Sequence, residues 1–333
     1  MIREDYVQSS ATTRIFEKSL LDLSTINKLI DSTDYEEFKR ILSDTSYGEL
    51  ANSINSRTEF DEGLDEEANK MYREFQRMIK DPELIEILTA KYTFHNLKTL
   101  LKNRILDEDL MYLILRVNDY DYEGIYSEIM EHGKVSKDKS FSEYINKALE
   151  EYNDSKDPQR LDMQMDMFQY EYMLSLAKET NSSIIVEYVR NLIDAQNINM
   201  TLRAKQQNHR VNCVADFLIE GGNIPREIYL TYYFEDIGEI IKEFKSYNIY
   251  KSLEEALDRY GEDGKLLHFR QTTDFYLDQI SIRGKKITYG PEVLFSYMLR
   301  KEREIRILRT IVIGKINDLT PDEIRERAGE LVA

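Results

Sequence analysis

One short segment of this sequence has the composition of a phosphate-binding loop, residues 261–265 (Gly-Glu-Asp-Gly-Lys). A true loop of that kind has four residues between its glycines and Ser or Thr after its lysine. This segment has two residues between its glycines, and Leu266 follows the lysine. We therefore interpret it as a polar loop between helices, and the sequence predicts no nucleotide site there.

The other residues that could do chemistry are four histidines and one pair of aspartates. No histidine belongs to a helical metal-binding pair such as His-Glu-x-x-His, and His95 is expected to pack in the core of an apolar helix. Asp162 and Asp166 are four residues apart and share one helix face, where two carboxylates could act as acid and base or bind a hard cation. Among 62 acidic residues such pairs arise by chance, so we interpret this one as a solvated face. We expect no catalytic, cofactor-binding or metal-binding residues.

The composition favours a helical, intracellular protein. Glycine (13) and proline (5) are scarce among 333 residues, and both residues interrupt helices. The single cysteine, Cys213, excludes an internal disulfide and a multi-cysteine zinc site, and we interpret it as structural. No signal peptide is recognisable, and no apolar run approaches the roughly 20 residues that span a bilayer. We expect the chain to be cytoplasmic or to be held at the membrane by a partner.

Charge is distributed unevenly along the chain. The net charge is −17, which disfavours binding to nucleic acid or to an anionic lipid surface. Residues 281–333 hold 11 Lys and Arg against 8 Asp and Glu, a net charge of +3, so the first 280 residues carry −20. A local basic segment on an acidic chain could mark a docking face, although it could also be the surface charge of a buried-core helix.

Three helical elements recur in the same order along the chain. The first is at residues 93–101, 194–202 and 304–312, with apolar side chains three or four residues apart. The second element precedes each copy, at 69–72, 166–168 and 274–276. The third follows each copy, at 105–110, 223–228 and 319–324. Helices at 122–129 and 236–244 then have their counterpart at 34–42, near the N-terminus. The sequence thus predicts helical units at 60–158, at 159–263, and at 264–333 together with 1–59.

Asparagine occupies the same position in two of the three recurring helices. Asn96 and Asn197 lie in apolar surroundings, and a buried amide must be hydrogen-bonded. We predict a structural bond from each asparagine to a neighbouring helix. Ile307 holds the third position.

The stretch 291–327 carries four features in order: a Pro-Glu start to an apolar helix, a Glu-x-Glu-Ile patch, a Gly-Lys end, and a Pro-x-Glu-Ile helix start. In this it resembles the C subunit of the archaeal and bacterial V-type (A-type) rotary ATPase, the counterpart of the d subunit of the eukaryotic vacuolar ATPase. That family has asparagine where this chain has Ile307. The resemblance covers essentially the whole chain and is most specific in its last forty or so residues.

The resemblance implies an all-α, funnel-shaped protein with three similar helical units around a pseudo-threefold axis. It implies a non-catalytic place in the central stalk, between the D and F subunits of the shaft and the membrane rotor ring of proteolipid subunits. Such a protein would be peripheral, at the cytoplasmic face, and would transmit the torque that couples ATP hydrolysis or synthesis to H⁺ or Na⁺ transport. It would have no cofactor and would not insert into lipid.

For the docking surface we name basic candidates in the positive segment. They are Arg283, Lys285, Lys286, Arg300, Lys301 and Arg303. The alternative to a rotor subunit is a cytosolic α-helical scaffold that binds a soluble partner, and an all-α enzyme with an unrecognised carboxylate site is a third possibility. Scaffolds of that kind repeat every ~34–47 residues, whereas the period here is 101 and then 110 residues, counted from Asn96 to Asn197 and on to Ile307.

Overall fold

The computed structural model describes residues 2–53, 57–106, 108–115, 117, 120–138 and 140–329. Within those residues the chain is all-α and contains no strand. The α-helices are α1 (Val7–Phe16), α2 (Leu23–Asp31), α3 (Tyr35–Ser43), α4 (Gly48–Ser53), α5 (Arg57–Met78), α6 (Glu83–Leu106), α7 (Tyr122–His132), α8 (Ser142–Ser155), α9 (Pro158–Glu179), α10 (Ser183–Gln206), α11 (Val211–Ala215), α12 (Arg226–Thr231), α13 (Ile237–Lys242), α14 (Tyr250–Asp263), α15 (Leu267–Ile282), α16 (Pro291–Ile316) and α17 (Pro321–Ala328). The 3-10 helices are η1 (Arg3–Tyr6), η2 (Glu17–Ser19), η3 (Met111–Leu113), η4 (Glu243–Ser246) and η5 (Arg283–Lys286).

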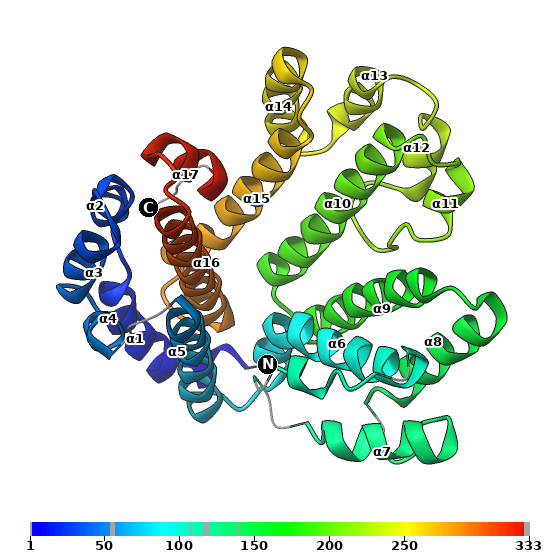
Figure 1. Ribbon diagram of the computed structural model, residues 1–333, viewed down its shortest axis with the longest axis horizontal. Coiled ribbons are helices and arrows are strands. Elements are labelled where there is room, and N and C mark those ends of the chain that lie inside the picture. The colour runs from blue at the N-terminus through cyan, green and yellow to red at the C-terminus, as the bar shows by residue number, and fades with distance from the viewer. Residues whose placement is uncertain are drawn as a thin grey trace.

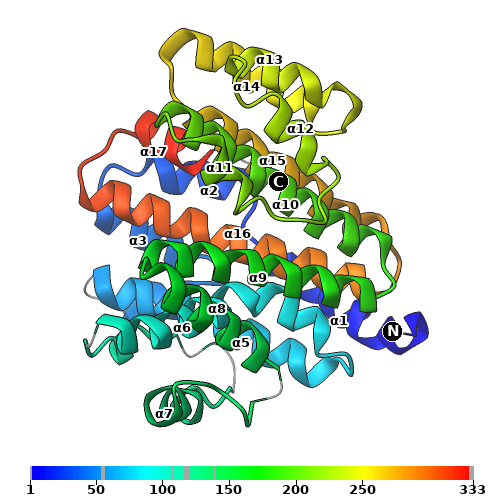
Figure 2. The same ribbon diagram turned by 90° about the vertical axis from the view of Figure 1, so that its right-hand side faces the viewer.

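Long helices α5, α6, α9, α10, α15 and α16 contact one another in a closed cycle. Each packs against the next in chain order, and α16 returns to pack against α5 (Figure 1). Figure 2 shows these helices stacked between α7 at one end of the molecule and α13 and α14 at the other. Because the last long helix contacts the first, no end of the helix array is left unpaired.

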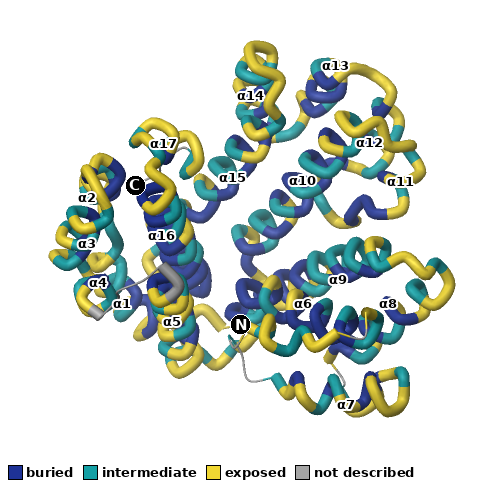
Figure 3. The backbone as a smooth tube through the Cα atoms, viewed as in Figure 1, coloured by how far each residue is buried: buried dark blue, intermediate teal, exposed yellow. Residues whose placement is uncertain are grey.

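Three hydrophobic cores hold this cycle together. One core joins the N-terminal helices to α16 and includes the start of α6, the end of α9 and the start of α10. A second core lies between α6 and α9 and is covered by α7 and α8. A third lies between α10 and α15 and is covered by α11 to α14. Figure 3 shows the buried residues along the long helices and mainly exposed ones at the covering helix α17. The first core therefore includes α5, α16 and parts of α6, α9 and α10, whereas α6 with α9 and α10 with α15 each enclose a further core.

The N-terminal helices pack against the last two helices. Helix α1 lies against α16, and α2 lies against α17. Lys315, buried at the end of α16, donates to the backbone carbonyl oxygen of Ile30 at 2.6 Å and to that of Ser32. Gly314 lets α17 approach, since a Cβ atom there would lie 2.5 Å from Cγ1 of the fully buried Ile324. The Gly-Lys pair at the end of α16 thus joins both terminal segments to that helix.

Asn96 and Asn197 make the same pair of bonds. The side chain of Asn96 donates to the carbonyl oxygen of Leu115 and accepts from its N–H, both at 2.8 Å. Asn197 makes the equivalent bonds to Ile219, both at 2.9 Å. The prediction of a structural hydrogen bond is confirmed, but its partner is a backbone segment after the helix rather than a neighbouring helix. Ile307, at the third position, is buried among apolar side chains.

A lysine stands eight residues after Asn197 and eight residues after Ile307. Lys205 Nζ donates to the carbonyl oxygen of Tyr233 at 3.0 Å, three residues before the capping Asp236 of α13. Lys315 binds the carbonyl oxygen of Ser32, two residues before the capping Asp34 of α3. Lys315 therefore contacts the segment before α3 in the same way that Lys205 contacts the segment before α13. The division into three units with the boundaries given above stays a prediction.

Local packing and capping explain the course of three helices. Helix α5 begins at Arg57 and includes Gly63. Phe60 and Leu64 are fully buried there, and burial of two such side chains outweighs the helix cost of about 1 kcal/mol for the intervening glycine. At the start of α17, Thr320 and Glu323 form a capping box. Helix α16 is a core helix, with Ile305, Leu308, Ile311 and Val312 buried.

Candidate docking surface

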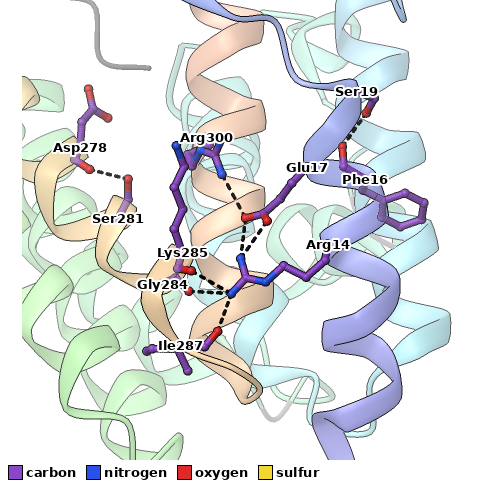
Figure 4. A network of polar contacts seen from close by, with 10 residues as sticks. All are labelled: Arg14, Phe16, Glu17, Ser19, Asp278, Ser281, Gly284, Lys285, Ile287 and Arg300. Atoms are coloured by element: carbon purple, nitrogen blue, oxygen red, sulfur yellow. Dashed lines mark hydrogen bonds and ion pairs between the residues drawn. The ribbon is translucent and has the colours of Figure 1, made fainter.

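The basic turn η5 is fixed to the N-terminal helix by one arginine. The guanidinium of Arg14, on α1, donates to the backbone carbonyl oxygens of Gly284 at 3.1 Å, Lys285 at 3.3 Å and Ile287 (Figure 4). Gly284 is required here, because a Cβ atom would lie 2.3 Å from that of Ser296. The turn is therefore held to α1 through its backbone carbonyl groups, and this contact uses none of its basic side chains.

Glu17 links this turn to α16. Its carboxylate accepts from Arg14 at 2.8 Å and from Arg300 at 3.0 Å, and the side chains of Glu17 and Arg300 are both largely buried (Figure 4). Burial lowers the pKa of Arg300, and the charge of Glu17 opposes that shift. Arg300 thus acts inside the fold, where it positions η5.

The three candidates on η5 itself are exposed. Arg283 forms an ion pair of 2.6 Å with Glu187 of α10. Partial burial lowers the pKa of Lys285, and nearby Arg300 lowers it further. Lys286 is exposed beside it. These side chains form a basic surface on an acidic chain, and we call Arg283, Lys285 and Lys286 the η5 patch.

Lys301 lies inside the fold. Its ammonium pairs with Glu304 at 3.0 Å and sits 4.0 Å from the ring centre of Tyr47. Glu304 also accepts from the Tyr47 hydroxyl at 2.7 Å. Burial is the larger cause of the raised pKa of Tyr47, and the charge of Glu304 adds to it. The Glu-x-Glu-Ile patch therefore provides an internal partner for Lys301, and this lysine does not face solvent.

Arg303 is also buried, and it joins α16 to α15. Its Nε lies 2.9 Å from a carboxylate oxygen of Asp278. Burial raises the pKa of Asp278 to about 6, against the opposing charges of Arg303 and Arg306. Of the six candidates, the structure places three in the η5 patch and three within the protein. Whether they dock a partner stays a prediction.

Arg306 is not among the six basic candidates named from the sequence. Arginines recur at every third residue of α16, at positions 300, 303, 306 and 309. Three of them have carboxylate partners, and Arg309 pairs with Asp65 at 2.6 Å and with Asp61 at 3.3 Å. Arg306 is exposed and forms no ion pair with any described carboxylate. The three-residue spacing could have indicated this row from the sequence, but not which member lacks a partner.

A second polar cluster lies beside Arg306. Glu302 accepts from Lys91 of α6 at 2.6 Å and from the Tyr72 hydroxyl of α5. Burial raises the pKa of Glu302 to about 8, and the charge of Arg306 opposes this. Burial also lowers the pKa of Lys91, and repulsion from Arg306 and Arg309 contributes. This cluster ties α5 and α6 to α16, where the helix cycle closes.

The other sequence-derived interpretations are corrected in part. His95 is exposed, contrary to the prediction of a core residue, because the apolar face of α6 is formed by its neighbours. Cys213 is exposed on the short helix α11, so it is not a buried structural residue. Asp162 and Asp166 each pair at 2.6 Å with a lysine of α6. In the described ranges no group of His, Cys, Asp and Glu is placed to hold a metal ion.

A comparison with known protein families identifies the family of this chain. The family described as ATP synthase (C/AC39) subunit matches residues 9–327. The chain belongs to this family. It is 24% identical to the C subunit of the V-type sodium ATPase of Enterococcus hirae over 97% of this chain and 98% of that protein. It is 22% identical to the C subunit of the A-type ATP synthase of Methanocaldococcus jannaschii, over 96% and 85% of the two chains. With the protein of the same name from Methanobrevibacter smithii it shares 25%, over 93% and 84%.

Family membership agrees with the site geometry. The chain is a non-catalytic subunit of a V/A-type rotary ATPase, so its polar clusters hold helices together rather than convert a substrate. None of the helices in the described residues is long and apolar enough to cross a membrane. The function of the chain therefore depends on the surfaces that contact other subunits of the complex.

Proposed function

We propose that this chain is the central-stalk subunit that joins the D and F shaft to the membrane rotor ring. In this role it receives the end of the shaft and rests on the ring at the cytoplasmic face, and it inserts no segment into lipid. It transmits the torque that couples ATP hydrolysis or synthesis to H⁺ or Na⁺ transport. Family membership and the closed helix cycle support this proposal.

The closed cycle of long helices is the observation that carries the proposal. A torque-bearing connector must resist shear, and close-packed helices have the low compressibility of a crystal. An open array would yield at its ends, whereas here α16 is held to α5 and α6 by Arg309 and Glu302. A force applied at any helix is therefore shared by both of its neighbours.

We also propose that the cycle consists of three similar units that match the boundaries given above. The paired bonds of Asn96 and Asn197 support this repeat, as do those of Lys205 and Lys315. The third unit is then completed by the N-terminal segment. Three similar units around one axis give a natural socket for a shaft.

Docking in this proposal is electrostatic. The η5 patch and Arg306 supply positive charge on a chain whose first 280 residues carry −20. Complementary charges at a solvated interface steer association and fix orientation more than they add affinity. Arg300 supports the patch from inside, because Glu17 links it to Arg14 and so to η5. Lys301 and Arg303 instead pair with Glu304 and Asp278. Binding should weaken as salt rises, since exposed charges are screened beyond about 8–10 Å at physiological ionic strength.

Charge reversal at the patch tests the docking surface. Lys285→Glu with Lys286→Glu changes the patch by four charges, and Lys245→Glu with Lys251→Glu makes the same change at exposed sites elsewhere. Each variant is titrated against purified D/F shaft and detergent-solubilised ring at low and physiological salt. We expect the patch variant to lose affinity roughly tenfold or more for one of them and to lose its salt dependence, with the control unaffected. Equal affinities and equal salt dependence for both variants would remove the patch from the interface.

A further inference from the structure

Ion pairs join α6 to α9 and α16 to α5. Between α6 and α9, Lys98 pairs with Asp166 and Lys102 pairs with Asp162, both at 2.6 Å. Between α16 and α5, Arg309 pairs with Asp65 at 2.6 Å. At both junctions a cation on the first helix therefore meets a carboxylate on the second.

The junction between α10 and α15 breaks this rule. Asn199 stands two residues after Asn197, as Lys98 stands two after Asn96, and it donates to the Thr273 hydroxyl at 3.1 Å. One turn further along α10, Arg203 takes the position of Lys102. The polar residue of α15 beside it is Arg270, so two arginines stand where the first junction has an ion pair.

These two arginines line one cavity of about 210 Å³. Its other walls are Asn199 and three leucines, Leu202, Leu266 and Leu267. Neither Arg203 nor Arg270 forms an ion pair with a carboxylate in the described part of the chain. The carboxylate one turn from Arg270 is Asp274, and it also interacts with Arg303 and Arg306. The cavity therefore has two guanidinium groups and no carboxylate in its lining.

Such a cavity has the chemistry of an oxyanion site. Two guanidinium groups repel each other, and each presents a planar fork that matches the oxygens of phosphate. Both guanidinium groups are exposed to solvent, so an ion in solution can reach them directly, and the buried Leu202 lies beside them. The volume admits a small anion with several water molecules, but it is too small for a nucleoside as well.

We infer that a free phosphate ion binds between Arg203 and Arg270. The bound ion replaces the carboxylate that closes the equivalent contact between α6 and α9, and it links α10 to α15 through both arginines. The site needs no other protein, so it stands apart from the docking role proposed above. It gives the isolated chain a stability that depends on phosphate.

Thermal unfolding and isothermal titration calorimetry of the purified chain test this site. Sodium phosphate is compared with sodium chloride at the same pH and ionic strength. We expect phosphate to raise the melting temperature and to bind with a stoichiometry of one. Arg203→Gln with Arg270→Gln should abolish both effects, whereas Arg190→Gln with Lys251→Gln, which removes the same charge from exposed sites on α10 and α14, should preserve them.

A second variant separates loss of the site from loss of the fold. Arg270→Asp places a carboxylate opposite Arg203, in the arrangement of Lys102 and Asp162. Its melting temperature in chloride should rise above that of the unmodified chain and should no longer respond to phosphate. ADP tests whether the site prefers phosphate groups that are part of a nucleotide. We expect ADP to bind more weakly than free phosphate. The inference is overturned if the unmodified chain does not respond to phosphate, if the Gln pair binds it equally well, or if ADP binds more tightly.

Discussion

Asn197→Ala should be one of the most destabilising single substitutions in this protein. The asparagine is 1% exposed, and it satisfies both the N–H and the carbonyl oxygen of Ile219, which is also buried. A buried backbone group without its partner costs about 1–3 kcal/mol. Alanine leaves two such groups, so we expect a loss of about 2–5 kcal/mol in the free energy of unfolding. That loss is a large share of the ~5–15 kcal/mol that stabilises a typical domain.

Asn96→Ala provides an internal comparison for this estimate. Asn96 makes the same two bonds, but its partner Leu115 is 37% exposed, so water can replace the lost amide. We expect this variant to lose only about 1 kcal/mol. Asn153→Ala, at an exposed position of α8, should stay within about 0.5 kcal/mol of the unmodified protein.

Urea denaturation monitored by circular dichroism measures all three variants. The m-value reports whether a substitution changes the cooperativity of unfolding, and the midpoint reports the stability. The reasoning is refuted if Asn197→Ala costs no more than Asn96→Ala, because the difference in burial of their partners would then have no energetic effect.

Two further predictions concern α16 and its partner helix. Leu308→Ala removes a fully buried side chain and should cost roughly 2–5 kcal/mol in urea denaturation; an unchanged melting temperature would mean that α16 is exposed. Asp278→Asn tests the pKa of about 6 that burial gives this carboxyl group. A raised pKa stabilises the fold below the ordinary value near 3.8 and loses this contribution as pH rises through 6. Asparagine does not titrate, so between pH 4.5 and 7 the variant should gain stability relative to the unmodified protein, by at most about 3 kcal/mol. A constant difference between the two proteins across this range would argue against the shift.

The helical class and the core face of α16 could be predicted because their signals are local. Leu308 and Ile311 follow helical periodicity, and Thr320 and Glu323 form a capping box from residues three apart. The structural role of Asn96 and Asn197 was also readable, since an amide in an apolar helix must find a partner. Periodicity and capping depend on neighbours in the chain, which a single sequence contains.

The candidate docking residues could not be sorted from the sequence alone. Lys301 and Arg303 look like surface charges, yet both are buried because Glu304 and Asp278 supply partners, the second of them from another helix. Charge type and spacing do not reveal which carboxylates the fold brings near. His95 was misassigned for a similar reason, because only packing decides which side of α6 is covered.

Assembly of the stalk tests the central claim most directly. Purified D/F shaft and detergent-solubilised rotor ring are mixed with and without this chain, and complexes are separated by size-exclusion chromatography. The account predicts that shaft and ring elute together only when the chain is present, in a complex that contains all three. Co-elution of shaft and ring to the same extent without the chain, or a chain that binds neither of them, would contradict its role as the connector.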